Sequence, residues 1–259
     1  MLRQLVSNLP STVCSLAGML LAAALVAGCS TNPMTGRSQL MLVTEQSAIA
    51  QSASHYQAMM GSLEKNGKIS TDEALNARVQ DITDRLVNQA VRYRPDTRAW
   101  AWTVKVIDAP ETLNAFCMPG GRMAIFSGMM TRLDASDDEI AQVMGHEIAH
   151  ALANHGAEKM SVAMAANLAV VAVAAAGRNN SQRVGLYNAA TLAALAFINL
   201  PNSRQAETEA DKLGVELAAR AGYDPHAAVT LWSKMLQQKG GRAAPDFLST
   251  HPSTDKRIA

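Results

Sequence analysis

The sequence has little of three things that mark common protein classes: cysteine, aromatic side chains and an excess of charge of one sign. Its 259 residues include 3 cysteines, and aromatic residues make up 4% of the chain. Lys and Arg number 23 against 22 Asp and Glu, and the basic residues are scattered along the sequence. Because the charge is balanced and the basic residues are scattered, we expect no nucleic-acid partner. The many Ala, Leu, Val and Met residues favour helices over an all-β architecture.

Long apolar runs are also lacking, because none reaches the roughly 20 residues that a bilayer-spanning helix needs. The run of residues 13–27, which contains Cys14, instead fits the apolar region of a secretory signal. It closes on the sequence VAGC, ending at Cys29. This ending resembles the bacterial lipobox, in which the signal is cut before a cysteine that then carries a lipid. The alternative is an ordinary signal peptide or an uncleaved anchor with an incidental cysteine.

The lipobox resemblance predicts how the N-terminal part of the chain is organised. Residues 1–28 would be a lipoprotein signal peptide, and residues 29–45 would be a polar tether that begins at the lipidated Cys29. Ser30 follows the cysteine, which by the same resemblance favours the outer membrane of a Gram-negative bacterium, facing the periplasm. Cys117 would then be the single cysteine of the mature domain, so we expect no intramolecular disulfide and a small buried apolar role for it.

The stretches before residue 130 have clear periodicity. Apolar residues recur at helical spacing over about 45–93, with an interruption at the Lys-Asn-Gly sequence of 65–67. Residues 100–106 alternate between apolar and polar side chains, which predicts a strand with one buried face. Residues 113–118 and 123–126 are two further strand candidates, and the Pro-Gly-Gly sequence between them predicts a hairpin.

The rest of the chain is predicted to be helical. Ser136 followed three residues later by Glu139 is a capping-box pattern, which marks a helix start. Two almost wholly apolar stretches, 162–176 and 184–200, form either a packed helical hairpin or one that dips into a membrane or grips an apolar substrate. Two further helices are expected over about 203–221 and 225–239.

The segment HEIAH, which begins at His146, has the spacing of a zinc-binding helix. His146 and His150 lie four residues apart and therefore on one helix face, so both imidazoles reach one ion. Zinc binds neutral imidazole, and a catalytic site keeps one position for water. Glu147 is the candidate general base, because it lies beside the first ligand and can pass a proton from the water to the leaving amine.

The third ligand is not fixed by this segment alone. In the extended motif HExxHxxGxxH a third histidine would stand at position 156, where this chain has Gly156. His155 lies only five residues beyond His150, and we expect it to point away from the ligand face as a surface or packing histidine.

A later acidic helix offers the ligand instead. In the sequence SRQAETEAD, Glu207 and Asp211 share one helix face, whereas Glu209 points about 200° away from Glu207. We therefore predict Glu207 as the ligand and Asp211 as a partner that orients an imidazole. The alternative, on these residues alone, is a solvated acidic face.

Four motifs in order resemble the HtpX and CAAX-prenyl-protease type of zinc metallopeptidases: LNAFCMPGGRMAIFSGMM, HEIAH, SRQAETEAD and THPSTDKRI. The resemblance covers about residues 70–258 and is strongest to small periplasmic lipoprotein members. It implies an α+β, mostly helical gluzincin domain, placed here at 46–259, with a small sheet or hairpin beside the HExxH helix. It also implies one Zn²⁺ per chain, held by His146, His150 and Glu207.

The same resemblance suggests roles for four further residues. Asn114 and Ala115 would hold the substrate main chain by accepting it as an added strand. Arg204 would be a structural or transition-state-side cation near the metal helix. His251 is either a packing group or a latch that occupies the open zinc position.

The leading hypothesis is a metalloendopeptidase that cleaves misfolded or unassembled cell-envelope proteins and is held to the membrane by the lipid on Cys29. The competing hypothesis is a zinc-holding periplasmic chaperone or assembly factor with little proteolysis. The intact Glu147 argues against it, because a pure binder needs no base. A structural lipoprotein with a chance motif is disfavoured by the four motifs in order.

Overall fold

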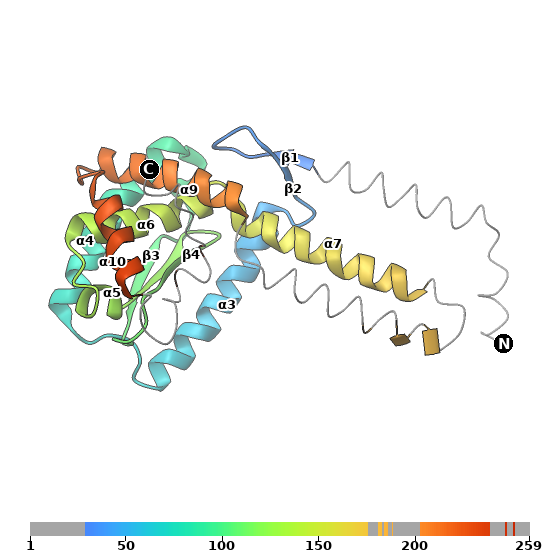
Figure 1. The fold of residues 1–259 in the computed structure, drawn as a ribbon, viewed down its shortest axis with the longest axis horizontal. Helices are drawn as coiled ribbons and strands as arrows, with labels where there is room; N and C mark the ends of the chain where they lie inside the picture. Colours follow the sequence, from blue (N-terminus) through green and yellow to red (C-terminus); the bar gives the residue numbers. More distant parts are fainter. Residues whose placement is uncertain are drawn as a thin grey trace.

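The computed structural model describes residues 29–175, 181–182, 184–185, 188, 203–238, 247 and 251. Its described part is mostly helical and contains one three-stranded sheet and one two-stranded hairpin (Figure 1). The α+β, mostly helical class expected from the sequence is therefore confirmed.

Two long helices precede the sheet, as the helical spacing predicts. They are α3 (Glu45–Lys65) and α4 (Glu73–Tyr93). Thr44 caps α3 by accepting from the backbone N–H of Ser47, and Asp72 caps α4 in the same way. Gly67 follows the end of α3 with φ of 64°, a conformation that glycine adopts without strain.

The sheet has the strand order β3-β5-β4, so β4 lies at an edge. Its strands are β3 (Thr103–Ile107), β4 (Ala115–Met118) and β5 (Arg122–Phe126), with β5 parallel to β3 and antiparallel to β4. The predicted β4–β5 hairpin is confirmed. The first strand begins later than expected, at Thr103, and Trp100 and Trp102 pack against each other ahead of it, with ring centroids 5.2 Å apart.

The sheet is covered on both faces. On one face the side chains of α3, including Tyr56, pack against alternate strand residues, and the Tyr56 hydroxyl donates to the Met123 carbonyl at 2.9 Å. On the other face Met123 and Ile125 join the main core with residues of α4 and α6 (Asp137–Leu152). Between α4 and α6 in the sequence, the chain also forms η1 (Pro95–Ala99) and α5 (Gly128–Thr131).

Helix α6 lies at the centre of the molecule, between the sheet and α9 (Arg204–Arg220). The predicted capping box of Ser136 and Glu139 is present at its start, and every residue from Glu139 to Leu152 is buried. Two glycines allow α6 and α9 to cross closely, since a Cβ added to Gly214 would lie 2.7 Å from the Cα of His146. Helix α10 (Ala227–Gln237) packs against the same core.

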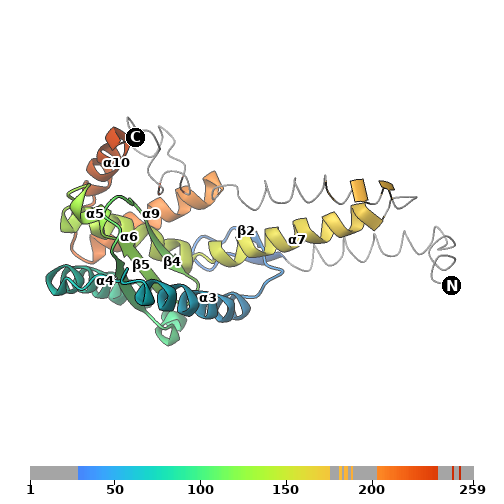
Figure 2. The same ribbon diagram turned by 90° about the horizontal axis from the view of Figure 1, so that it is seen from below.

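Helix α7 (His155–Ala175) extends away from this core, as Figures 1 and 2 show. Met164 and Leu168 on it are each 45% exposed, so this leg of the expected apolar hairpin is only partly packed. Most of the second leg, 184–200, lies outside the described residues. No helix among the described residues combines the length and the apolar character that crossing a membrane requires.

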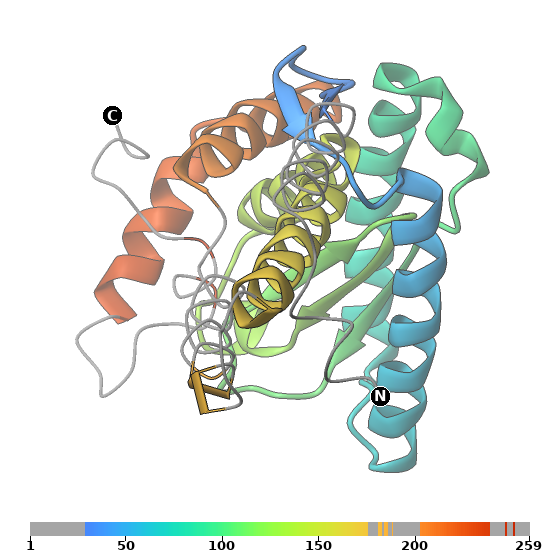
Figure 3. The ribbon, with the colours of Figure 1, turned by 90° about the vertical axis from the view of Figure 1, so that its right-hand side faces the viewer.

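The segment expected to be a polar tether is folded over much of its length. Strands β1 (Cys29–Thr31) and β2 (Ser38–Leu40) pair in an antiparallel hairpin beside α7 and α9 (Figure 3). Asn32 and Gln39 are buried there, and both amide groups donate to the carbonyl oxygen of Ala153, which offsets the cost of burying them. We call residues 29–40 the N-terminal hairpin.

Candidate metal centre

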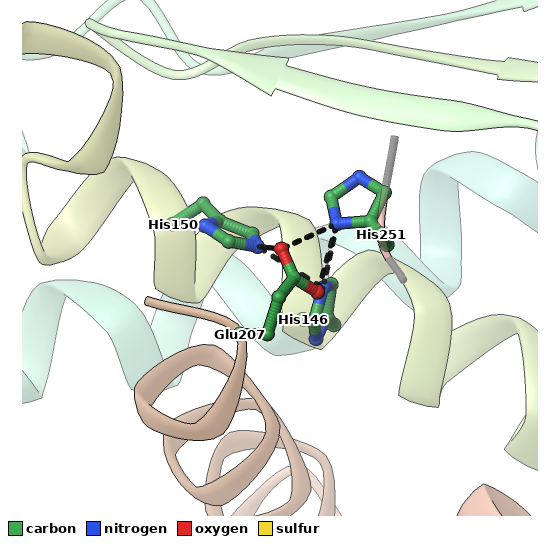
Figure 4. A group of neighbouring side chains, drawn as sticks. All are labelled: His146, His150, Glu207 and His251. Carbon is green, nitrogen blue, oxygen red and sulfur yellow. Dashed lines mark hydrogen bonds and ion pairs between the residues drawn. The ribbon is translucent and has the colours of Figure 1, made fainter. Parts of the chain in front are cut away.

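Helix α6 directs His146 and His150 to the same point. Their Nε2 atoms are 3.1 Å apart, and both side chains are buried. One helical turn separates the two residues, so their approach follows from the spacing in the sequence. Figure 4 shows both rings facing Glu207 and His251.

Glu207 and His251 complete a cluster of four donors. Glu207, on the first turn of α9, lies 3.5 Å from His146 Nε2 and 3.4 Å from His150 Nε2. The Nδ1 atom of His251 lies 3.0 Å from Glu207 Oε1 and 3.2 Å from His146 Nε2. The four ligand atoms all lie within 4.8 Å of one another.

The cluster fits a zinc ion in both chemistry and size. Three imidazole nitrogens and one carboxylate oxygen are ligands that zinc prefers. A tetrahedron with bonds of about 2.0–2.1 Å has edges of about 3.3–3.4 Å. Between donors of this cluster the separations given above run from 3.0 to 3.5 Å, close to those edges.

The electrostatics of the pocket also favour a cation. Burial alone would lower the pKa of His146, but hydrogen bonds to Asp211 and Glu207 outweigh it and raise the pKa to about 9. Burial lowers the pKa of His150 well below its usual value. Burial opposes ionisation of Glu207, yet hydrogen bonds from the three neighbouring histidines hold its pKa far below the normal range. The buried carboxylate is therefore ionised, and a positive charge beside it is stabilising.

Asp211 and Glu147 lie against two different imidazoles of the donor cluster. The Oδ1 atom of Asp211 is 3.0 Å from His146 Nδ1, the nitrogen that faces away from Glu207. A carboxylate there holds the hydrogen on Nδ1, so the lone pair of Nε2 would face the cluster when a bound metal takes the place of the second proton. Glu147 Oε1 lies 3.4 Å from His251 Nε2, so the candidate base borders the position that His251 occupies.

Of the two roles expected for His155, the packing role is confirmed, and His155 is not one of the four donors; its contact with His150 was not expected. His155 is buried, and its Nδ1 lies 2.8 Å from Nδ1 of His150. The expected direction of His155 assumed that the helix of the HEIAH segment runs on past it. Instead α6 ends at Leu152, and Asn154 has φ of 58°. Asn tolerates that left-handed conformation, so Asn154 was the residue in the sequence that indicated an end of the helix before His155.

Sequence reasoning also missed the partners of Glu209 and the position of Phe247. Glu209 indeed points away from Glu207, but its Oε2 lies 2.9 Å from His155 Nε2. The ring of Phe247 stacks on that of His251, with centroids 4.4 Å apart, and its N–H donates to the carbonyl of Leu113 at 3.0 Å.

Within the described part of the chain, no strand pairs with the edge of β4 that faces away from β5, and this edge lies beside the site. The N–H of Phe126 donates to the carbonyl of Asn114, and Ala115 is opposite Ile125 in the register. In an antiparallel pair, residues that hydrogen-bond to the partner strand alternate with residues that do not. Asn114 bonds to β5, so the backbone groups of Ala115 and Cys117 point away from β5, toward this edge. The Ala115 N–H is held by the side-chain oxygen of Asn114 at 2.9 Å. Burial and the nearby Glu147 raise the pKa of Cys117, so its thiol stays protonated.

Two predicted residues lie away from the cluster. Arg204 is exposed on the first turn of α9, so its position gives no support to a role at the metal. Cys29 is exposed at the start of β1.

The chain is similar to known metallopeptidases. The profile of peptidase family M48 matches residues 73–259. The mitochondrial metalloendopeptidase OMA1 of Arabidopsis thaliana is 43% identical over 157 residues, which are 61% of this chain and 30% of that protein. Human OMA1 is 30% identical over 235 residues, covering 88% of this chain and 44% of its own length. Metalloprotease LoiP of Escherichia coli is 31% identical over 149 residues, 57% of this chain and 56% of that protein. The chain thus spans less than two thirds of these relatives.

Proposed function

Because this chain belongs to peptidase family M48, we propose that it is a zinc-dependent endopeptidase of cell-envelope proteins. The family match covers residues 73–259 and supports zinc as the metal of the four-donor cluster. The finer assignment, to the HtpX and CAAX-prenyl-protease type and to its periplasmic lipoprotein branch, is part of the proposal. It rests on the motifs and on the lipobox-like sequence before Cys29.

The observation that carries the proposal is the four-donor cluster with the buried carboxylate of Glu147 beside it. His146, His150 and Glu207 hold the ion, and Asp211 orients His146. Zinc, when bound, polarises the scissile carbonyl and makes water acidic enough to be deprotonated near neutral pH. Glu147 takes that proton and delivers it to the leaving amine.

The open edge of β4 supports a polypeptide as the substrate. An extended peptide laid along Ala115 and Cys117 would pair its main chain with the outward backbone groups of this strand. Such pairing recognises the main chain of any extended segment. This is what an enzyme that removes unfolded or unassembled proteins requires.

We further propose that the described conformation is a closed form of the enzyme. His251 fills the fourth donor position and lies against Glu147. Phe247, four residues earlier, is fully buried and bonds to Leu113 just ahead of the β4 edge. His251 thus takes the fourth donor position and Phe247 lies at the start of the strand edge, so both residues must move before a substrate and a catalytic water enter.

Casein digestion tests the proposed chemistry. We expect the wild-type protein to digest casein, and both Glu147→Gln and chelation of the metal to abolish this activity. Glu147→Gln removes the base but none of the four donors, so this variant should still bind one zinc per chain. Digestion that survives either treatment would contradict the mechanism. If cells that carry Glu147→Gln keep a cell envelope as intact as that of cells with the wild-type protein, the chaperone or assembly-factor alternative is favoured.

Labelling with a fatty-acid analogue tests the proposed anchor. We propose that the lipid is on Cys29 and that Ser30 directs the protein to the outer membrane, facing the periplasm. In a Gram-negative host the wild-type protein should incorporate the label and sediment with outer membranes. Cys29→Ala should do neither, whereas Cys117→Ala, the matched control, should behave as wild type. Label on the Cys29→Ala variant would refute the assignment.

A further inference from the structure

Behind the zinc ligand His150 lies a second histidine and then a carboxylate. His150 turns Nε2 toward the donor cluster, while its Nδ1 lies 2.8 Å from Nδ1 of His155. The other ring nitrogen of His155 lies 2.9 Å from Oε2 of Glu209. The line runs from the end of α6, through the first residue of α7, to α9.

The order of these groups dictates where the hydrogens are. An ionised carboxylate only accepts, so the His155 nitrogen that faces Glu209 carries a hydrogen. The other nitrogen of a neutral His155 then accepts, and His150 must donate from Nδ1. The lone pair of His150 Nε2 is left facing the cluster, which is the tautomer that a zinc ligand needs.

The N-terminal hairpin holds the far end of this line. Arg37 Nε lies 2.7 Å from Glu209 Oε1, and the other guanidinium nitrogens bind both oxygens of Glu158 at 2.8 and 2.7 Å. Asn32 donates to Glu209 Oε2 at 3.3 Å and to the carbonyl of Ala153, just beyond the end of α6, at 3.1 Å. The carboxylate is therefore fixed from a part of the chain far from the HEIAH segment in sequence.

We propose that His155 and Glu209 are positioning residues for the zinc ligand His150, and that Arg37 and Asn32 of the N-terminal hairpin hold Glu209 in place. This inference rests on the proposed function in one respect, that His150 binds zinc. It adds a second oriented imidazole to the one beside Asp211. It also ties the segment that begins at Cys29 to the geometry of the metal site.

Zinc affinity, measured by competition with a chromogenic chelator, tests the role of His155. His155→Phe keeps a buried ring but removes the acceptor for His150, and should weaken zinc binding about 10- to 100-fold. His155→Gln carries an acceptor and a donor on one amide and should recover most of the loss. The control His55→Phe, at an exposed histidine of α3, should bind zinc as wild type.

Substitutions on α9 test the carboxylate. Glu209→Ala should weaken zinc binding, whereas Glu216→Ala, which removes an exposed carboxylate of the same helix, should not. Glu209→Gln retains an acceptor for His155 and should lie between wild type and Glu209→Ala. With Co²⁺ in place of zinc, the visible absorption bands should shift in His155→Phe and Glu209→Ala and stay unchanged in both controls.

The outcomes separate positioning from a purely structural role. Wild-type zinc affinity and Co²⁺ spectra in both Glu209→Ala and His155→Phe would overturn the inference, even if thermal stability fell. A loss of affinity in His155→Phe that His155→Gln does not restore would also overturn it. If the wild type binds zinc and follows the expected affinity pattern but does not cut casein, the proposed peptidase function fails while the positioning role stands.

Discussion

At the scale of single residues, the metal centre depends on what stands behind each donor. The far nitrogen of His146 faces Asp211, and that of His150 faces His155. Each imidazole is therefore held by one hydrogen bond that selects its tautomer. His251 differs, because its Nδ1 faces the donor cluster and its Nε2 faces Glu147. It is the donor best suited to leave, since its departure frees both a ligand position and the base.

His251→Ala should therefore increase basal proteolysis. The remaining three donors retain the metal, while the fourth position and Glu147 become accessible to water. If the closed form makes up about 90% of the molecules, its removal would raise the initial rate of casein hydrolysis about tenfold. His226→Ala, at an exposed histidine before α10, is the matched control and should leave the rate unchanged. An unchanged or lower rate in His251→Ala would argue against the latch.

At the scale of elements, the crossing of α6 and α9 brings the ligands together. Gly145 and Gly214 face each other there, and a Cβ on Gly145 would lie 2.8 Å from the carbonyl oxygen of Gly214. The absence of both side chains lets the helices approach until Glu207 reaches the two histidines. The site thus depends on a glycine pair that carries no chemistry of its own.

Gly214→Ala should separate the two helices. Its Cβ would lie 2.7 Å from backbone atoms of His146, a contact that cannot be relieved by turning a side chain. We expect a loss of about 1–3 kcal/mol in the free energy of unfolding, together with weaker zinc binding. Gly61→Ala is the control, because nothing lies near its Cβ in helix α3, and it should gain up to about 1 kcal/mol. Urea unfolding of both variants measures this, and equal stability would refute the steric argument.

Sequence reasoning succeeded where local rules decide the structure. The capping box at Ser136 set the start of α6, and the Pro-Gly-Gly sequence set the β4–β5 hairpin. It failed where the chain changes direction or meets a distant segment. The contact of His155 with His150 was missed because the helix ends before it. The burial of Asn32 was missed because its partners, Ala153 and Glu209, are more than 100 residues away.

At the scale of the whole molecule, the metal centre joins segments that are distant in sequence. His146 and His150 come from α6, Glu207 from α9 and His251 from the C-terminal segment. The N-terminal hairpin reaches the same centre through Glu209. A ligand that binds only the folded arrangement stabilises all of these segments at once.

Removal of zinc should therefore lower the melting temperature of the whole domain. At a free zinc concentration about 100 times the dissociation constant, binding contributes about 2.7 kcal/mol. For a domain of this size that corresponds to a shift of roughly 5–10 °C. Differential scanning calorimetry of the wild type with zinc and after chelation measures it. Glu207→Ala, which lacks one donor on α9, should have a low melting temperature that zinc raises far less. An equal response to zinc in the wild type and in Glu207→Ala would show that Glu207 does not hold the ion.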